Sequence, residues 1–301
     1  YERFAAEYAF FGRSVWQQTL NLTDEEKTEL IRLLQENYRP ENRVYRYNFF
    51  YDNCATRPRD KIEESIAGKV IYPAEPQDGS LTFRDIVHQY CKGHPWARFG
   101  IDLCIGSEAD QPITQRQMMF APFYLMDAFD GAQIKGDSIQ RPLITANELI
   151  VDATPEPDES DWMPTPLQCS LLLFILTAAA TIYGIRRRTG LWGIDLFLFG
   201  IAGIVGCVLA FLALFSQHPA VSSNFLLLVF HPGQLLFLPY IIYCVRKGKK
   251  CWYLTLNLAV LTLFIVLFPV IPQRFDFAVV PLALVLLIRS ASNLIVTSKK
   301  K

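Results

Sequence analysis

The sequence predicts a small α+β domain followed by an α-helical domain that crosses a membrane five times. Apolar runs of about 20 residues repeat after Pro166, whereas mixed helical and alternating patterns fill the chain before it. Charge divides the chain at the same place: 12 of 29 Lys and Arg residues, but only two of 29 Asp and Glu residues, follow Leu167. An acidic polar half joined to an apolar half with basic residues at the ends of its apolar runs is typical of membrane proteins, not of nucleic-acid-binding proteins.

We expect three parts: a domain over residues 1–151, a Pro-rich acidic linker over 152–166, and a transmembrane domain over 167–301. A buried helical core in a soluble protein is the alternative for the last part, but five apolar runs in series favour membrane spans. The expected spans cover about 167–185, 191–215, 225–245, 252–271 and 277–297.

The loops between these runs predict the orientation of the chain. Basic residues follow the first, third and fifth runs, at Arg186–Arg188, Arg246–Lys250 and Lys299–Lys301, while the alternate loops hold only Arg274. Because basic loops remain in the cytoplasm, residues 1–166 should lie outside it and the C-terminus inside. The chain begins at Tyr1 with no signal peptide, so we expect a segment upstream of it.

The first part opens with strand and helix patterns. Residues 14–20 alternate and predict a strand, and Thr23–Glu26 is a capping box that predicts a helix over 24–38. The aromatic stretch Val44–Tyr51 predicts a second strand. One face of the first strand should present Trp16, Gln18 and Leu20.

The rest of this part contains shorter patterns. We expect helices over 81–90 and 112–129, an irregular segment from His94 to Asp102, and a closing strand within 135–151.

Cys54 is the candidate nucleophile. Asp52 and Asn53 are residue types that cap helices, and a helical pattern follows through Ala67. The cysteine would then lie at the positive end of a helix, which favours its thiolate. Free N–H groups of the same helix end would stabilise an oxyanion beside the sulfur.

The alternative for Cys54 is a small buried apolar residue. Pro58 weakens the helix argument, because proline cannot donate a hydrogen bond to the Cys54 carbonyl. Seven cysteines leave at least one thiol unpaired, and whether Cys91 and Cys104 form a disulfide stays open. The remaining candidates for packing roles are Cys169, Cys207 and Cys244.

A thiol nucleophile needs a base, normally histidine. No spacing ties any histidine to Cys54, although His94, in a loop, and His231, within the third run, are candidates for contact with substrate. A packing role is equally compatible with both positions. The sequence holds no Cys-x-x-Cys pair, no closely spaced His pair and no Gly-rich phosphate loop, so we expect neither metal nor cofactor.

Several segments together resemble the Lnb family of bacterial lipoprotein N-acyltransferases. The resemblance lies in Arg13–Thr23, Glu36–Arg43 and Tyr47–Arg57, and it extends through His94–Trp96 and Phe99–Asp102. It covers most of residues 1–150 and is similar to the periplasmic N-terminal domain of that family. The resemblance also implies a membrane domain after the periplasmic domain, which residues 167–301 would form.

The resemblance implies a rearranged papain-like (NlpC-type) thiol domain in the periplasm of a bacterial inner-membrane protein. It implies transfer of an acyl chain within a diacylglyceryl lipoprotein to the N-terminal amine, with membrane lipids and lipoproteins as partners and no nucleic acid. Cys54 matches the nucleophile, and the positions around it are kept by Asn53, Thr56, Arg57 and Asp60. The family's catalytic histidine, in a Gly-His motif, would precede Tyr1, so we expect an N-terminally truncated chain rather than one that has lost its chemistry.

Two other functions remain open. One is a membrane-tethered thiol peptidase or amidase of the cell wall, and the other is a non-catalytic periplasmic interaction module.

We expect Arg57 to hold a carboxylate or orient Asp60, with a plain surface ion pair as the alternative.

Overall fold

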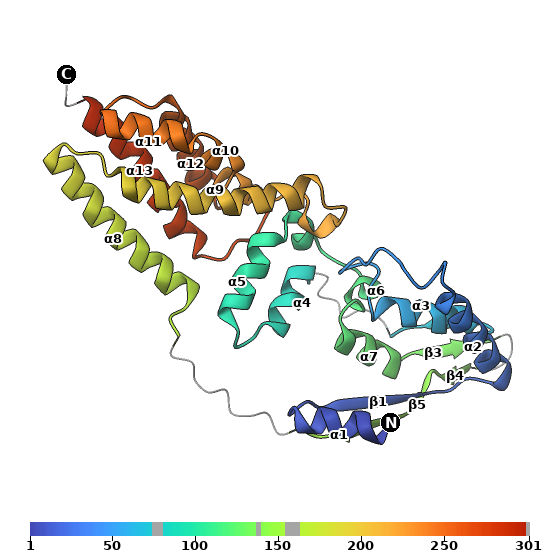
Figure 1. Ribbon diagram of the computed structural model, residues 1–301. Helices are drawn as coiled ribbons and strands as arrows, with labels where there is room; N and C mark the ends of the chain where they lie inside the picture. The colour runs from blue at the N-terminus through green and yellow to red at the C-terminus, as the bar shows by residue number, and fades with distance from the viewer. Residues whose placement is uncertain (74–80, 137–139, 154–162, 299–301) are drawn as a thin grey trace. The chain divides into compact units, whose positions relative to one another are not determined.

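The structure is a computed structural model that describes residues 1–73, 81–136, 140–153 and 163–298. It divides into two compact units (Figure 1), each with its own hydrophobic core. The first unit comprises Tyr1–Ile86 and Pro112–Trp162, and the second comprises Val87–Gln111 and Met163–Lys301. Most of the expected linker, residues 154–162, lies outside the described residues.

The helices of the first unit are short and largely amphipathic. The expected helix over 24–38 is confirmed, because Thr23 and Glu26 exchange both hydrogen bonds of a capping box at its start. The helices here are α1 (Glu2–Phe10), α2 (Asp24–Tyr38), α3 (Thr56–Ser65), the start of α4 (Phe83–Tyr90), α6 (Gln115–Met118) and α7 (Pro122–Asp130).

Two small antiparallel sheets accompany these helices. The expected strands over 14–20 and within 135–151 are confirmed, since β1 (Val15–Leu20) pairs with β5 (Ile144–Val151). The second sheet has the order β2 (Lys69–Ile71), β3 (Gln133–Lys135), β4 (Gln140–Pro142). Residues 137–139, between β3 and β4, lie outside the described residues.

Two apolar groups hold the first unit together. Phe50 stacks on Phe83 with ring centroids 4.2 Å apart, and Phe120 meets both rings edge-on at 5.3 Å. Aromatic pairs in such geometries add about 0.5–1.5 kcal/mol beyond their burial. The second group lies between α3, α7 and the sheets and consists of Ile66, Phe129, Ala132, Ile134, Leu143 and Ile144.

Three sequence-based expectations for elements outside the membrane-spanning helices were wrong. Val44–Tyr51 is not a strand: its one bridge joins Asn48 to Asp52, because Phe50 turns inward to the aromatic group instead of alternating. The helix expected over 112–129 is broken into α6 and α7, since Pro122 begins a new helix and Ala121 before it is extended. The segment after His94 is a regular helix, α5 (Pro95–Cys104), which opens on proline at its first position.

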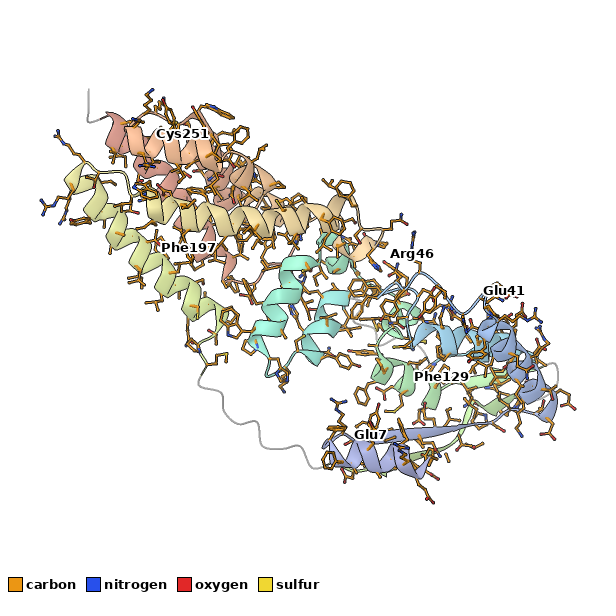
Figure 2. All side chains as sticks on the ribbon, in the orientation of Figure 1. Glu7, Glu41, Arg46, Phe129, Phe197 and Cys251 are labelled. Atoms are coloured by element: carbon orange, nitrogen blue, oxygen red, sulfur yellow. The ribbon has the colours of Figure 1, made fainter. Side chains whose placement is uncertain are left out.

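Long apolar helices make up most of the second unit. Many of their large side chains are exposed, among them Phe197 on α9 (Trp192–Leu214), which Figure 2 labels. An outward apolar face of this kind suits a lipid environment. The helices are α8 (Pro166–Arg187), α9 (Trp192–Leu214), α10 (Pro232–Leu236), α11 (Leu238–Lys247), α12 (Trp252–Leu267) and α13 (Val279–Ser298).

The third expected span, 225–245, is not one continuous helix. Among the described residues, three helices (α8, α9 and α13) are long and apolar enough to cross a membrane, and four if α11 and α12 count as one bent span. Pro232 and Pro239 stand at the starts of α10 and α11 and lack the N–H groups that a continuous helix would need there. A run of apolar residues does not reveal such breaks, and the expected count of five spans stays a prediction.

An ion pair lies inside this unit. Arg289 of α13 makes two hydrogen bonds to Asp195 of α9, at 2.7 and 3.0 Å, and a third to Thr181 of α8 at 3.0 Å. Both charged residues are buried. The pair therefore joins three helices and satisfies charges that would otherwise be costly in this interior.

Residues 87–111 pack with the membrane-spanning helices, although in the chain they separate the two parts of the first unit. The Asn224 side chain donates to the Leu103 carbonyl at 2.8 Å, and Gln273 donates to the Ile105 carbonyl at 3.2 Å. Arg274 forms an ion pair with Asp110 at 3.1 Å. These contacts attach α5 and the turn after it to two loops of the apolar unit.

Candidate functional site

Cys54 is exposed and lies between a tight turn and helix α3. The turn is closed by reciprocal backbone hydrogen bonds of 2.9 Å between Asn48 and Asp52. The Asn48 side chain accepts from the N–H groups of Phe50 and Tyr51, which fixes the turn locally. The exposed thiol excludes the alternative of a buried packing residue.

Asn53 holds the chain on both sides of the cysteine. Its side-chain oxygen accepts hydrogen bonds from the N–H groups of Ala55 and Thr56 at 2.8 and 2.9 Å. The Thr56 hydroxyl accepts from the Asn53 N–H at 2.8 Å. The capping role expected for Asn53 is therefore present, although α3 begins only at Thr56 and Ala55 is its flanking residue.

This capping changes the expected oxyanion site. The N–H groups of Ala55 and Thr56 are occupied by Asn53, and the Arg57 N–H donates to the Asn53 carbonyl. The sequence predicted free N–H donors beside the sulfur at this helix end. In the structure these N–H groups are already hydrogen-bonded. The Cys54 N–H itself makes no hydrogen bond within the described residues.

An apolar groove of about 450 Å³ opens beside Cys54. Its size falls within the range of about 300–1,000 Å³ that is typical of ligand pockets. Alternation along β1 directs one face of this strand into the groove, as the sequence predicted, and α7 supplies the opposite wall. The lining residues are Trp16, Gln18, Leu20, Cys54, Ala55, Ile62, Pro122, Phe123, Leu125, Met126 and Phe129.

Gln18 is the polar side chain of this groove that sequence reasoning passed over. Its Nε2 donates to the Met126 carbonyl at 2.9 Å, and an amide nitrogen carries two hydrogens. One donor therefore remains for a ligand. The signal in the sequence was a lone glutamine between Trp16 and Leu20 on a strand face that is otherwise apolar.

Tyr47 is a second residue near the Cys54 thiol, and the sequence did not mark it as a candidate. Burial raises the pKa of the Tyr47 phenol, and the nearby Cys54 and Tyr45 raise it further. The Tyr47 phenol therefore stays protonated at neutral pH.

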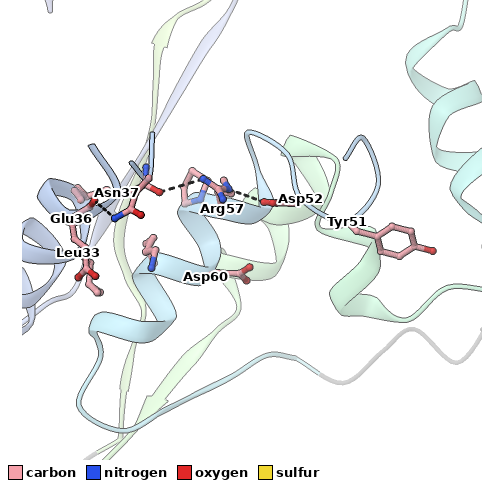
Figure 3. Close-up of a pocket in the computed structure, with 11 residues that line it drawn as sticks. Leu33, Glu36, Asn37, Tyr51, Asp52, Arg57 and Asp60 are labelled. Carbon is pink, nitrogen blue, oxygen red and sulfur yellow. Dashed lines mark hydrogen bonds and ion pairs between the residues drawn. The ribbon is translucent and has the colours of Figure 1, made fainter. Parts of the chain in front are cut away.

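Arg57 lies in a polar pocket of about 610 Å³ (Figure 3). It forms an ion pair with Asp52 at 2.8 Å, donates to Asn37 at 3.3 Å and stacks over the Tyr45 ring at 3.5 Å. Arg57 therefore holds the Asp52 carboxylate in a partly exposed ion pair, which the alternative of a plain surface ion pair also describes. No ion pair or hydrogen bond joins Arg57 to Asp60 among the described residues, although both line this pocket.

Asp60 belongs to a different charge cluster. Arg59 and Arg116 hold its carboxylate at 2.7 and 2.8 Å. Arg116 also contacts Glu63 at 2.8 Å. Burial would raise the pKa of Glu63, but hydrogen bonds from Arg116 and Tyr72 lower it below its usual range. Asp60 and Glu63 thus join α3 to the segment around Arg116.

All four histidines of the chain are in the second unit. His94 is exposed and flanks the start of α5, whereas His231 precedes α10 and contacts Asn257 at 3.4 Å. Neither lines the groove at Cys54. His88 hydrogen-bonds both carboxylate oxygens of Asp102, at 2.8 and 3.0 Å. Cys91 and Cys104 are free thiols, so no bridge joins them.

Comparison with known families gives two matches. A family model for the Lnb N-terminal periplasmic domain matches residues 1–88, and one for the Lnb transmembrane domain matches residues 158–301. The first match contains Cys54 and the turn before it. No curated protein and no solved structure matches the chain.

Proposed function

Because the chain belongs to the Lnb family, a family of membrane proteins with a periplasmic domain, we propose that it moves an acyl chain within diacylglyceryl lipoproteins. The acceptor is the N-terminal amine of the lipoprotein, and Cys54 carries the chain as a thioester. The observation that supports this best is an exposed thiol at an apolar groove of about 450 Å³.

The reaction has two steps. The Cys54 thiolate attacks the carbonyl carbon of the sn-2 ester, the ester C–O bond breaks, and the glycerol oxygen leaves and takes up a proton. The amine of the lipoprotein's first cysteine then attacks the thioester, the C–S bond breaks, and the nitrogen loses a proton. An ester and an amine become a hydroxyl and an amide, so no oxidant or reductant is needed.

Two donors from residues that line the groove suit the oxyanion of both steps. The Cys54 N–H is free of other bonds within the described residues, and Gln18 keeps one amide hydrogen. Removing one donor of this kind typically lowers the rate about 10²–10³-fold. We assign these groups, rather than the α3 N–H groups, to oxyanion stabilisation.

The groove supports this function over the alternatives. A wall hydrolase binds polar peptides and sugars, whereas ten of the eleven residues that line the groove are apolar or carry a thiol. An interaction module has no need of an exposed thiol beside such a groove. Arg57 and Asp60 are held in ion pairs away from the groove lining, so we assign them to positioning the Cys54 turn and α3.

The proposal includes a papain-like arrangement of the thiol domain. It places the protein in the inner membrane of a bacterium, with five membrane crossings and the C-terminus in the cytoplasm. Basic residues at the C-terminal ends of α8 and α11 support this orientation, namely Arg186, Arg187, Arg246 and Lys247. The third crossing would then consist of α10 and α11 together.

Cys54→Ser in the complete gene tests the chemistry. The proposal expects N-acylated lipoprotein peptides to fall about a thousandfold in mass spectra, because serine lacks the thiolate that attacks the ester. Cys91→Ser is the matched control, since this thiol lies in the other unit. Full N-acylation in the Cys54→Ser strain would reject the mechanism.

A further inference from the structure

Exposed apolar side chains gather in residues 39–51, the segment that joins α2 to the turn before Cys54. Val44 is 80 % exposed, although valine is among the residue types that folded domains most often bury. Three aromatic side chains are exposed within the next seven residues, namely Tyr47, Phe49 and Tyr51. Exposed apolar side chains that gather in this way mark contact with a partner or a membrane.

Arginines alternate with these apolar residues. Arg39, Arg43 and Arg46 are exposed, and their side chains make no ion pair or hydrogen bond within the described part of the chain. Figure 2 labels Arg46 and Glu41, the one acidic residue of the segment. A guanidinium without a carboxylate partner keeps its planar set of donors for an external anion, and phosphate fits that geometry.

The charge of this segment is opposite to that of the unit around it. The first unit holds 15 Lys and Arg residues and 24 Asp and Glu residues, a net charge of −9. Residues 39–51 hold three arginines and one glutamate, a net charge of +2. An anionic surface therefore repels the unit as a whole and attracts this segment, which orients the segment toward such a surface.

Three contacts hold the segment in place without covering its exposed side chains. Asn42 Nδ2 donates to the Glu36 carbonyl of α2 at 2.9 Å. The Tyr45 ring lies under the Arg57 guanidinium, 3.5 Å from it, and the Asn48–Asp52 turn closes the far end. Because the backbone is already fixed at these points, a contact made by the exposed side chains costs little additional ordering.

We propose that residues 39–51 bind the surface of a bilayer that contains anionic phospholipid. The arginines contact lipid phosphates, and Val44, Tyr47 and Phe49 enter the interfacial layer, where aromatic side chains are enriched in membrane proteins. A bilayer is within reach, because the same chain carries a membrane domain. The contact would hold the turn before Cys54 at the lipid surface, and the inference does not depend on acyl transfer.

Fluorescence quenching in nanodiscs tests this contact. The full protein carries a genetically encoded fluorescent amino acid in place of Val44, and the lipids carry brominated acyl chains, which quench a fluorophore only at close range. We expect strong quenching in phosphatidylglycerol and weaker quenching in phosphatidylcholine, which has no net charge. The same fluorophore in place of Ile31, an exposed residue of α2, is the control and should stay unquenched in both lipids.

Arg43→Gln combined with Arg46→Gln removes two charges and leaves the aromatic side chains in place. Each arginine near an anionic surface shifts binding about fivefold, so the bound-to-free ratio at Val44 in phosphatidylglycerol should fall about 25-fold. Arg3→Gln combined with Arg13→Gln is the matched control, since it removes the same charge from exposed positions of the same unit. This control should keep the quenching.

Absence of quenching at Val44 in both lipids would overturn the proposal and leave the segment to a protein partner. Equal quenching in phosphatidylglycerol and phosphatidylcholine would overturn it as well, because the arginines would then not select the surface. The same holds if the two double variants lower the quenching equally. Contact with lipid is read directly, so loss of acyl transfer has no bearing on the result.

Discussion

Asn53 Nδ2 donates a hydrogen bond of 2.8 Å to the carbonyl oxygen of Phe120, which joins the turn before Cys54 to a segment 67 residues later. The same nitrogen donates to the Phe49 carbonyl at 2.9 Å. Asn53 is 3 % exposed; its bond to Phe120 is buried, and its bond to Phe49 is partly buried. The position of Cys54 relative to the groove therefore depends on a side chain that is itself not part of the groove lining.

Asn53→Ala should lower the free energy of unfolding by about 2 kcal/mol, because it removes a cap and leaves buried N–H and C=O groups unpaired. Urea denaturation of the full chain in detergent, followed by tryptophan fluorescence, measures this. Asn42→Ala is the control, since its hydrogen bond to the Glu36 carbonyl is exposed. A loss no larger than that of Asn42→Ala would contradict the assigned role.

Arg57 and Asp52 should couple weakly. Both are partly exposed, at 32 % and 42 %, so a double-mutant cycle with alanine should give about 0.5 kcal/mol of interaction energy. The cycle of Arg57 with Asp60 should give none, because Asp60 is held by Arg59 and Arg116. Coupling of Arg57 to Asp60 that equals or exceeds its coupling to Asp52 would restore the original expectation.

Acid should destabilise the protein partly through Glu63. Hydrogen bonds from Arg116 and Tyr72 outweigh burial and lower its pKa in the folded state, so the folded form binds its proton less readily than the unfolded chain. This contribution to stability is complete above the unfolded pKa of 4.5 and is lost as the pH falls through the folded pKa.

Glu63→Gln should therefore flatten the acid side of a stability-versus-pH curve measured by thermal unfolding between pH 7 and pH 3. The exposed Glu25→Gln on α2 serves as the control and should leave that slope unchanged. An acid slope as steep in Glu63→Gln as in the unmodified protein would show that other groups determine it.

Leu125→Trp should shorten the apolar groove beside Cys54. Displacing about two methylene groups of a bound chain costs about 0.8 kcal/mol each, which is about a tenfold effect. The reactivity of Cys54 toward p-nitrophenyl palmitate, divided by that toward p-nitrophenyl acetate, should fall by this factor. Ile31→Trp, at an exposed position on α2, should not change the ratio. Equal loss with both esters would mean that the groove does not hold the acyl chain.

Local patterns in the sequence were sufficient for several elements. The capping box of Thr23 and Glu26 specifies the start of α2, because both partners lie within four residues of each other. Alternation along β1 indicated the face that now lines the groove. The runs of apolar residues indicated a membrane domain, since its composition differs so strongly from that of the preceding part.

The tertiary structure alone decided the partners of the charged side chains near Cys54. Arg57 and Asp60 are three residues apart, yet they do not pair with each other. Asp52 of the turn pairs with Arg57, and Arg116, which is distant in the chain, pairs with Asp60. The free donors near Cys54 could not be predicted for the same reason: Asn53 takes the two N–H groups that a helix end would otherwise offer.

The sequence by itself determined the start of α2, the strands β1 and β5 and the presence of a membrane domain, since those signals act between residues a few positions apart. Only the tertiary structure decided that the aromatic stretch before Cys54 turns inward to Phe83 and Phe120, and that the third apolar run breaks around Gly233. These outcomes depend on contacts between segments far apart in the chain, and the free energy of such contacts outweighs local preference.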